Sequence, residues 1–459
     1  TQVEDDKMSE GGLGAPERHP IPWQDAEFYD EEKLDAELRR QFDICHGCRR
    51  CHNLCDSFPL LFDLIDESES MELDTVDSKD FKPVIDACTL CDMCFMTKCP
   101  YVPPHEFNLD VPHLMLRYRA VELKKGDVPF VSKQISETDR NGKLAGAVAP
   151  LANWATRTGN GLTRPVMQSV SGIDKDAALP KFHGRTLTAR AKTDAPAINE
   201  SAPAKGRKAV VYATCFVNYN DPVMGTDALE VLARNGVETE VLHPACCGMP
   251  KLEHGDIEGV AAAAKKVAAV FKPWIEKGYD VVALTPSCSL MLKFEWPLIL
   301  PDDADIKLLS GATRDISEYI VDIAKNEGLA DGMDPLDGAV TVHLACHARA
   351  QNMGQKAAEL LRLIPDAEVN VIERCSGHGG SWGMMKGNFD TALKIGRPVA
   401  RKAIETAPKY VVSECPLAGL HILQGMERLA EKEETPPTIP EHAPHPIQLI
   451  AKSYRHDRK

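Results

Sequence analysis

The cysteines are the residues of this chain whose number and spacing indicate chemistry. The 459 residues include 15 cysteines, and eight of them form two short runs before residue 100. The first run, C-x2-C-x2-C-x3-C, consists of Cys45, Cys48, Cys51 and Cys55. The second, C-x2-C-x2-C-x4-C followed by Pro100, consists of Cys88, Cys91, Cys94 and Cys99. Disulfide frameworks are typical of short secreted chains, so the length of this chain favours metal ligation instead.

The spacing of the two runs predicts two [4Fe–4S] clusters. Three cysteines at two-residue gaps can surround one cubane, and the trailing fourth cysteine normally ligates the other cluster. We therefore assign Cys45, Cys48, Cys51 and Cys99 to one cluster. The other is assigned to Cys88, Cys91, Cys94 and Cys55. The alternative is a pair of structural zinc sites, although zinc sites are usually built from two C-x2-C pairs per ion.

The other seven cysteines follow predicted strands in two similar halves. They are Cys215, Cys246, Cys247, Cys288, Cys346, Cys375 and Cys415. Apolar and β-branched runs predict strands at 209–214, 237–242, 281–285, 339–344, 368–372 and 410–413. Helical spacing predicts helices at 226–234, 256–271, 356–364 and 389–404, the last kinked at Pro398. Each half is therefore expected to run strand–helix–strand–helix–strand, with a parallel sheet and right-handed crossovers.

The spacing between corresponding cysteines indicates an internal duplication. Cys346, Cys375 and Cys415 follow Cys215, Cys246 and Cys288 by 131, 129 and 127 residues, respectively. The carboxyl ends of parallel strands meet at one edge of a sheet, where ligands bind. We therefore expect the cysteines of each half to converge there, as a cluster or metal site requires.

Several motifs resemble a known family. They are CFVNYN at 215–220, CCG at 246–248, PSC at 286–288, CH at 346–347 and GGSWGMMKGN at 379–388. Together with the two cysteine runs they look like the cysteine-rich CCG subunits of heterodisulfide reductases and iron–sulfur oxidoreductases, including the C subunits of anaerobic glycerol-3-phosphate dehydrogenases. The resemblance implies a subunit that accepts electrons from a flavoprotein and passes them through clusters toward a quinone or a disulfide. It also implies that a complete C…CCG…CxxC pattern holds a non-cubane [4Fe–4S] cluster.

The first half departs from that pattern at one position. Met291 stands where the family pattern has the last cysteine of CxxC. Four thiolates remain, and they suffice for a further iron–sulfur cluster. The predicted ligands are Cys215, Cys246, Cys247 and Cys288.

The second half departs further, since Ser376 and Ala418 replace two family cysteines. Its predicted metal ligands are Cys346, Cys375, Cys415 and, as the best supplement, His378. His347 or Glu414 are the other candidates for the fourth place. The site is expected to hold a cluster or a Cys3His zinc ion. Alternatively, it no longer binds metal and is retained only as part of the fold. Loss of these cysteines argues against disulfide-cleaving chemistry.

Composition narrows the function classes. The formal net charge of −15 argues against nucleic-acid binding. No apolar run reaches 18 residues and no apolar signal-like segment begins the sequence, so we expect a cytoplasmic protein without a transmembrane span, free or peripheral on the inner membrane face. No G-x-G-x-x-G follows a predicted strand, so a flavin or hydride donor is expected on a partner protein.

The expected fold class is α/β, with an α-helical two-[4Fe–4S] ferredoxin-like domain and duplicated parallel-sheet CCG-type halves. The expected organisation is an acidic tail (1–40), the ferredoxin-like domain (41–125), a linker or docking segment (126–207) and two CCG-like halves (208–335 and 336–459). The apolar run at 145–154 is interpreted as part of a surface-packed linker or, alternatively, as an amphipathic element that touches a membrane or a hydrophobic partner.

The expected function is that of an iron–sulfur electron-transfer subunit of a redox complex. It would pass electrons from a flavoprotein or ferredoxin-type donor to a quinone, a disulfide or a redox partner protein. The alternatives are a catalytic disulfide or quinone reductase acting at the CCG-like cluster, and an electron donor to a rubrerythrin-like, peroxide-reducing di-iron protein. A zinc scaffold without redox function is the remaining class. The chemistry on a substrate is expected to be completed by a partner subunit.

Overall fold

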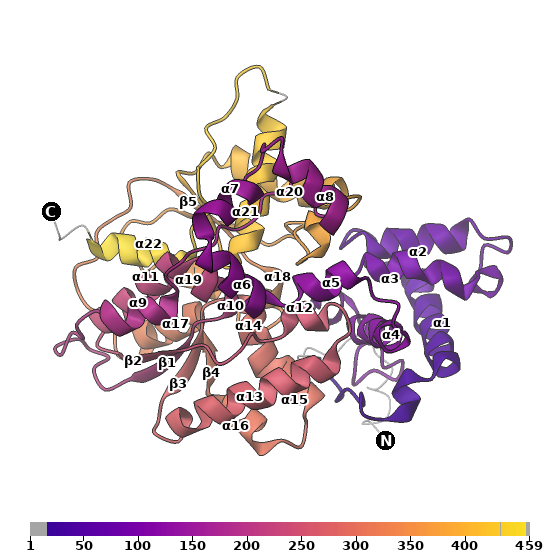
Figure 1. The fold of residues 1–459 in the computed structure, drawn as a ribbon, viewed down its shortest axis with the longest axis horizontal. Helices are drawn as coiled ribbons and strands as arrows, with labels where there is room; N and C mark the ends of the chain where they lie inside the picture. Colours follow the sequence, from indigo (N-terminus) through magenta and orange to yellow (C-terminus); the bar gives the residue numbers. More distant parts are fainter. Residues whose placement is uncertain (1–15, 432, 456–459) are drawn as a thin grey trace, which may run out of the picture.

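The computed structural model describes residues 16–431 and 433–455 and shows a mixed α/β fold (Figure 1). Helices make up the part before residue 207, and two parallel sheets follow it. The first sheet has the strand order β2-β1-β3-β4 and the second has the order β6-β5-β7. All of their pairings are parallel, as the alternating strand and helix pattern predicted.

The first sheet is built from four short strands. They are β1 (Lys208–Tyr212), β2 (Glu238–Leu242), β3 (Asp280–Ala283) and β4 (Thr313–Asp315). Between and after them lie α10 (Cys215–Tyr219), α11 (Pro222–Arg234), α12 (Met249–Leu252), α13 (Ile257–Ile275), α14 (Pro286–Leu290), η6 (Met291–Glu295), α15 (Trp296–Ile299), α16 (Ala304–Ala312) and α17 (Ile316–Asn326). The predicted cap of α13 is present, since the Asp256 side chain accepts a hydrogen bond from the Gly259 N–H. Strand β4 was not predicted, because its three residues contain no apolar run.

The second sheet repeats this plan. Its strands are β5 (Val340–His343), β6 (Val369–Ile372) and β7 (Tyr410–Ser413). Its helices are α18 (Cys346–Arg349), α19 (Lys356–Leu361), η7 (Trp382–Met384), α20 (Phe389–Glu405), α21 (Pro416–Ala430) and α22 (Pro446–Tyr454). In both sheets the first strand pairs with the second on one side and the third on the other, which supports the predicted duplication. All six predicted strands are present within two residues of their expected bounds.

The N-terminal helical part contains both cysteine runs. Its elements are η2 (Ala26–Tyr29), α1 (Glu31–Cys48), α2 (Ser57–Asp66), η3 (Leu73–Thr75), η4 (Ser78–Phe81), α3 (Lys82–Asp86), η5 (Cys94–Lys98) and α4 (Val111–Lys125). Of the expected acidic tail, residues 1–15 lie outside the described part of the chain. Residues 16–40 of this expected tail are packed rather than extended, because Ile21 and Phe28 are buried and α1 already begins at Glu31. Leu34, Leu38 and Phe42 recur at helical spacing, so α1 buries one continuous face.

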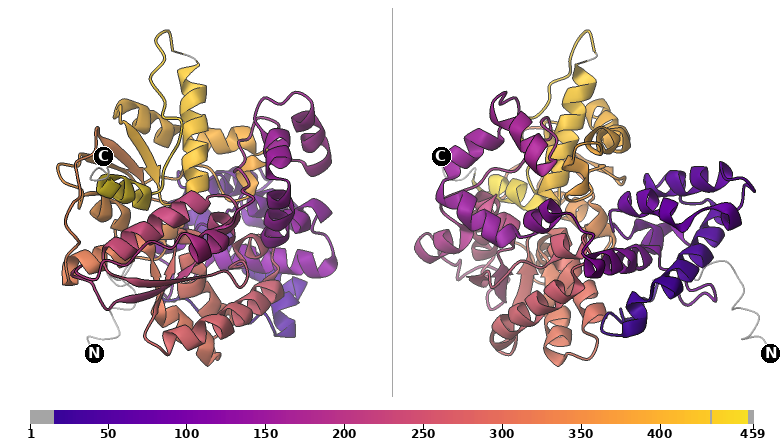
Figure 2. Two further views of the ribbon diagram at one scale, coloured as in Figure 1. Left: turned by 60° about the vertical axis from the view of Figure 1, so that its left-hand side comes forward. Right: turned by 45° about the vertical axis from the view of Figure 1, so that its right-hand side comes forward.

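The segment expected as a linker forms five short helices. They are α5 (Phe130–Ile135), α6 (Thr138–Ala147), α7 (Ala149–Thr156), α8 (Thr163–Ser171) and α9 (Leu187–Thr193). Figure 2 shows them along the outside of the sheet-containing part. The many glycines and prolines of this segment limit each helix to two or three turns, and this is why the sequence showed only weak periodicity.

The first sheet lies between two cores because its side chains alternate between two faces. Val210 and Tyr212 of β1 belong to a core shared with the N-terminal helices. Val211 belongs to a second core, which also contains Val342 of β5. The first half is thus packed against the N-terminal helices on one side and the second half on the other. No helix among the described residues is long and apolar enough to cross a membrane.

Candidate iron–sulfur centres

The four cysteines predicted to hold the first cluster are brought together at the end of α1. Cys45 and Cys48 occupy the last turn of this helix, which ends at Arg49 in the left-handed conformation. Burial raises the pKa of the Cys45 thiol, and the neighbouring charges of Cys99, Cys51 and Cys48 raise it further. The negative charges of these four sulfurs would therefore lie close to one another, although Cys99 is far away in sequence.

The second set is gathered by a tight loop after α3. Cys91 lies between Leu90 and Asp92, both left-handed with φ of 48° and 63°, and these turns fold the loop back on itself. The pKa of the buried Cys94 thiol is raised by burial and then by the charges of its neighbours. In order of size, these are Cys91, Cys88, Cys51 and Cys55. The second set thus includes Cys55 of the first run and adjoins Cys51 of the first set.

The first CCG-like half collects its cysteines at the carboxyl edge of its sheet. Cys215 begins α10 after β1, the Cys246–Cys247 pair follows β2, and Cys288 lies in α14 after β3. The Sγ atoms of Cys215 and Cys246 are 3.5 Å apart, and those of Cys247 and Cys288 are 3.3 Å apart. The predicted convergence of these four thiols is therefore present in the structure.

The backbone next to the cysteine pair is held closely. Gly248 has a φ of 86°, and a Cβ atom there would lie 3.1 Å from the Val260 side chain. The indole Nε1–H of the buried Trp296 donates a hydrogen bond to the Cys247 carbonyl oxygen at 3.1 Å. Glycine is thus required at this turn for its conformation and for close packing.

Two residues of α6, which the sequence analysis did not single out, also belong to this site. Asp139 accepts hydrogen bonds from the Cys246 N–H at 2.7 Å and from His243 at 2.6 Å. Burial opposes ionisation of Asp139, but these hydrogen bonds hold the pKa of its carboxyl below the ordinary value. The buried Thr138 hydroxyl also lies beside the thiols of Cys215 and Cys246. No local motif marks either residue, because the contact depends on how α6 packs.

The second half brings its three cysteines together at the equivalent edge. Cys346 begins α18 after β5, Cys375 follows β6 and Cys415 is the N-cap of α21 after β7. Burial raises the pKa of the Cys346 thiol, and the charges of Cys375 and Cys415 add to this effect. The Gly377 N–H donates to the Cys375 Sγ at 3.3 Å.

The candidates for a fourth ligand in the second half differ in availability. Burial lowers the pKa of His378 to about 3, and nearby His421 contributes, so the imidazole is neutral. Its Nε2 atom has no hydrogen-bond partner among the described residues. Both ring nitrogens of His347 are engaged, Nδ1 with the Ser287 hydroxyl at 2.8 Å and Nε2 with the Leu90 carbonyl oxygen at 3.3 Å. Burial raises the pKa of Glu414 well above its ordinary value, which disfavours the carboxylate.

The cysteine sets follow one another through the molecule. Burial is the main reason that the pKa of Cys91 is raised, and the charges of Cys346 and Cys375 raise it further. The second set of the N-terminal part therefore adjoins the second half. Cys288 contributes in turn to the raised pKa of Cys415, which relates the second half to the first. His347 makes the same connection through hydrogen bonds, because Leu90 lies between Cys88 and Cys91 and Ser287 precedes Cys288.

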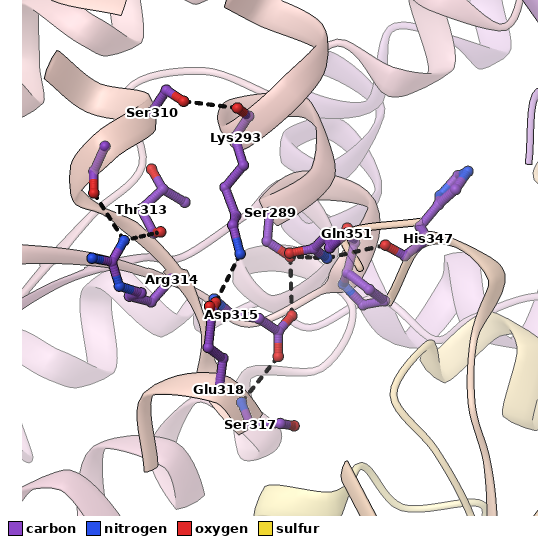
Figure 3. A network of polar contacts seen from close by, with 12 residues as sticks. Ser289, Lys293, Ser310, Thr313, Arg314, Asp315, Ser317, Glu318, His347 and Gln351 are labelled. Atoms are coloured by element: carbon purple, nitrogen blue, oxygen red, sulfur yellow. Dashed lines mark hydrogen bonds and ion pairs between the residues drawn. The ribbon is translucent and has the colours of Figure 1, made fainter. Parts of the chain in front are cut away.

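A buried polar network supports this junction (Figure 3). The Gln351 amide donates to the Ser289 hydroxyl at 3.0 Å, and this hydroxyl donates to Asp315 at 3.0 Å. Burial raises the pKa of Asp315 to about 6. The network therefore joins α14 of the first half to Gln351, two residues after α18, in the second half.

The donor sets fit iron–sulfur clusters. Buried thiols that raise each other's pKa are unfavourable as thiolates unless a cation compensates their charge. Iron–sulfur clusters ligate thiolates and supply that charge. In residues 16–431 and 433–455, no three His, Cys, Asp or Glu side chains are placed to hold a single metal ion.

The comparison with known protein families agrees with the two halves. The model of the CCG cysteine-rich domain matches residues 209–293 and again residues 340–422. The chain belongs to the CCG cysteine-rich domain family. The two matches cover strands β1–β3 and β5–β7 and confirm the family resemblance inferred from the sequence motifs.

Individual relatives include proteins named as iron–sulfur proteins and subunits of redox enzymes. The chain is 29% identical to the C subunit of the anaerobic glycerol-3-phosphate dehydrogenase of Escherichia coli (strain K12), over 70% of this chain and 76% of that protein. It is 30% identical to the lactate utilization protein A of Bacillus pumilus, over 38% of this chain and 74% of that protein. It is 27% identical to the B subunit of the fumarate reductase (CoM/CoB) of Methanothermobacter marburgensis, over 49% and 43% of the two chains. This CCG protein is therefore homologous to subunits of dehydrogenase and reductase complexes.

Proposed function

We propose that this CCG protein is an iron–sulfur electron-transfer subunit that carries electrons from a flavoprotein partner to a quinone or disulfide acceptor. Two [4Fe–4S] clusters would be held by the N-terminal cysteines in the exchanged arrangement described above. A further iron–sulfur cluster would be held by Cys215, Cys246, Cys247 and Cys288. The clusters, when bound, supply the one-electron redox chemistry, and the chain supplies burial, spacing and hydrogen bonds.

The observation that carries the proposal is the continuous succession of cysteine sets. The first N-terminal set adjoins the second through Cys51 and Cys94. The second adjoins the second half through Cys91 and Cys346, and Cys415 then adjoins Cys288 of the first half. Electron transfer requires closely spaced redox centres, whereas a zinc scaffold does not require its sites to succeed one another.

The homologous proteins and this chain's own residues support the proposed kind of partner. Two of the relatives named above belong to a glycerol-3-phosphate dehydrogenase and a fumarate reductase. This sequence contains no dinucleotide-binding glycine motif after a strand. We therefore assign the flavin and the substrate chemistry to a partner protein and electron transfer to this chain.

Metal analysis of the anaerobically purified protein tests the proposal directly. Three [4Fe–4S] clusters would contribute twelve iron and twelve sulfide ions per chain, and the two N-terminal cubanes alone would contribute eight of each. The dithionite-reduced protein should give the electron paramagnetic resonance spectrum of interacting S = 1/2 centres. Iron well below eight per chain, or stoichiometric zinc without sulfide, would contradict the proposal.

Reoxidation of the reduced clusters tests the class of acceptor. The protein is reduced with one equivalent of dithionite per cluster and mixed anaerobically with menadione or with oxidised glutathione. A quinone-directed subunit should regain its visible absorbance with menadione at least tenfold faster than with the disulfide. The reverse preference would favour the alternative of a disulfide reductase acting at the first CCG-like site.

A further inference from the structure

Helices α6, α7 and α8 expose an unusual density of large apolar side chains. Six of these side chains are between 51% and 76% exposed, so no other described part of the chain covers them. They are Leu144, Val148, Leu151, Leu162, Val166 and Val170. We call this set the apolar face. Exposed apolar clusters of this kind mark sites of interaction with proteins or membranes.

The spacing of the apolar face gives it the pattern of an amphipathic surface. Leu162, Val166 and Val170 follow one another at four-residue intervals and form one stripe on α8. The other side of α8 carries Arg164, which is buried and donates hydrogen bonds to the carbonyl oxygens of Asp174, Lys175 and Ala177. Arg164 thus fixes the loop beneath α8, while the apolar stripe remains in solvent.

The charge of this region is opposite to that of the whole chain. Residues 138–171, which span α6–α8, contain four lysines and arginines and one aspartate, a net formal charge of +3, in a chain whose net charge is −15. Arg140, Lys143 and Arg157, which belong to or directly follow α6 and α7, are exposed. Apolar and basic side chains together on short helices are typical of segments that lie in the interface of an anionic membrane.

We propose that α6–α8 form a docking surface for anionic lipid, which holds the protein on a membrane without crossing it. Trp154 of α7 is 47% exposed, and tryptophan favours the interfacial region of a bilayer. Because the attraction is partly electrostatic, binding depends on anionic lipid and weakens with salt. A protein partner or a second copy of the chain would use the apolar face without requiring the basic residues.

This surface is connected to the first CCG-like site by one short helix. Asp139, at the start of α6, accepts the hydrogen bond from the Cys246 N–H, and Leu144 lies five residues further along the same helix. At 1.5 Å per residue, this separation is about 7.5 Å along the axis. Lipid binding by itself is independent of the proposed function. If that function holds, this contact would place the first CCG-like site near an acceptor dissolved in the membrane.

Sedimentation with vesicles tests the proposal on the full chain purified anaerobically. The vesicles are phosphatidylcholine alone, or phosphatidylcholine with 40% phosphatidylglycerol, in 50 mM and 500 mM salt. We expect binding to the anionic vesicles at 50 mM salt and at least tenfold weaker binding at 500 mM salt or without phosphatidylglycerol. The double variant Val166→Glu/Val170→Glu should lose at least tenfold in affinity, and Lys143→Gln/Arg157→Gln should lose its preference for anionic lipid.

Val270→Glu is the matched control, since Val270 is 40% exposed on α13, which lies below the first sheet and away from α7 and α8 in Figure 1. It should bind vesicles as the unmodified protein does. Circular dichroism and cluster absorbance establish that each variant is folded.

Absence of binding to anionic vesicles at low salt overturns the proposal, as does undiminished binding of the α8 variant. If the α8 variant instead converts a dimer into a monomer in sedimentation equilibrium, the occupant is a second copy of the chain. Loss of clusters in the unmodified protein would contradict the proposed function and leave the lipid result intact.

Discussion

The two halves of the duplicated part differ chemically at single residues. The first half has Cys247 as the second cysteine of its CCG motif, whereas the second half has Ser376 at the corresponding place. A serine hydroxyl is a poor iron ligand at neutral pH because it must lose a proton of high pKa to bind well. His378, whose buried imidazole is neutral and has an unpartnered Nε2, is the strongest replacement among the described residues of the second half.

This asymmetry predicts unequal effects of equivalent substitutions. Cys247→Ser should remove one whole cluster, about four iron ions per chain, and stop electron flow to the acceptor. Cys415→Ser should remove less iron, because the second site offers only three thiolates. Iron and sulfide analysis with visible spectra measures both variants. Equal loss of iron and of activity in the two variants would show that Ser376 and Ala418 do not distinguish the sites.

At the scale of single elements, α6 depends on a close contact with α10. A Cβ atom at Gly142 would overlap the ring of Tyr219, which ends α10 four residues after Cys215. Gly142→Ala should therefore push α6 away and lower the free energy of unfolding by about 1–3 kcal/mol. Because α6 also carries Asp139, the spectrum of the first CCG-like site should change as well.

Gly161→Ala is the matched control for this substitution. Gly161 is exposed, and a Cβ atom there would meet nothing within 4 Å. Urea unfolding under anaerobic conditions should give a change within about 0.5 kcal/mol. If Gly142→Ala proved equally neutral, α6 would have to be more mobile than its contacts indicate.

The last helix, α22, should make stability depend on pH through its cap. The buried His445 accepts a hydrogen bond from the Ile447 N–H at 3.2 Å, and burial lowers its pKa to about 3. The unfolded chain binds a proton below about pH 6.5, while the folded chain stays unprotonated at this residue until about pH 3. This contribution to stability is therefore full above pH 6.5 and is lost progressively as the pH falls toward 3.

His445→Asn tests this prediction because asparagine can cap the helix but does not titrate. At pH 5.5, the cost of keeping His445 unprotonated is roughly 1 kcal/mol relative to neutral pH. Between pH 7.5 and pH 5.5, the free energy of unfolding measured with urea should fall by roughly 1 kcal/mol less in the variant than in the unmodified protein. His442→Asn, at an exposed position in the same loop, should keep the original pH dependence.

At the scale of the whole molecule, Arg18 ties three distant segments together. Its guanidinium contacts Asp92 at 2.7 Å, Asp110 at 2.9 Å and Glu295 at 2.9 Å, and the Arg18 side chain is only 11% exposed. Asp92 belongs to the second cysteine loop and Glu295 to the first CCG-like half. The arginine therefore connects the N-terminal cysteine loops to the duplicated part, and it lies far from every cysteine in the sequence.

Arg18→Met should be strongly destabilising, because it leaves three partly or fully buried carboxylates without their cation. We expect a loss of about 3 kcal/mol in the free energy of unfolding. Increased susceptibility to limited proteolysis between the N-terminal helices and the first half should accompany it. Arg40→Met, which removes an exposed pair with Glu37, should cost less than about 1 kcal/mol. Comparable losses in the two variants would contradict the connecting role of Arg18.

The amino-acid sequence was sufficient to predict the family, the duplication and six of the seven strands found in the described residues. Cysteine spacing and strand periodicity are local properties of the sequence, so they can be recognised without knowledge of the packing. The placement of Cys215, Cys246 and Cys288 directly after strands was enough to predict their convergence, since parallel strands end at a common edge.

Packing in three dimensions revealed how the sites are related to one another and to the surface. Asp139 meets the backbone of Cys246 across 107 residues of sequence, and His347 hydrogen-bonds to both Leu90 and Ser287. Such contacts depend on how helices and sheets dock, and no periodicity or spacing encodes them. The sequence drew attention to the apolar run at 145–154, but only the structure decided which apolar residues of 126–207 stay in solvent and added the stripe on α8.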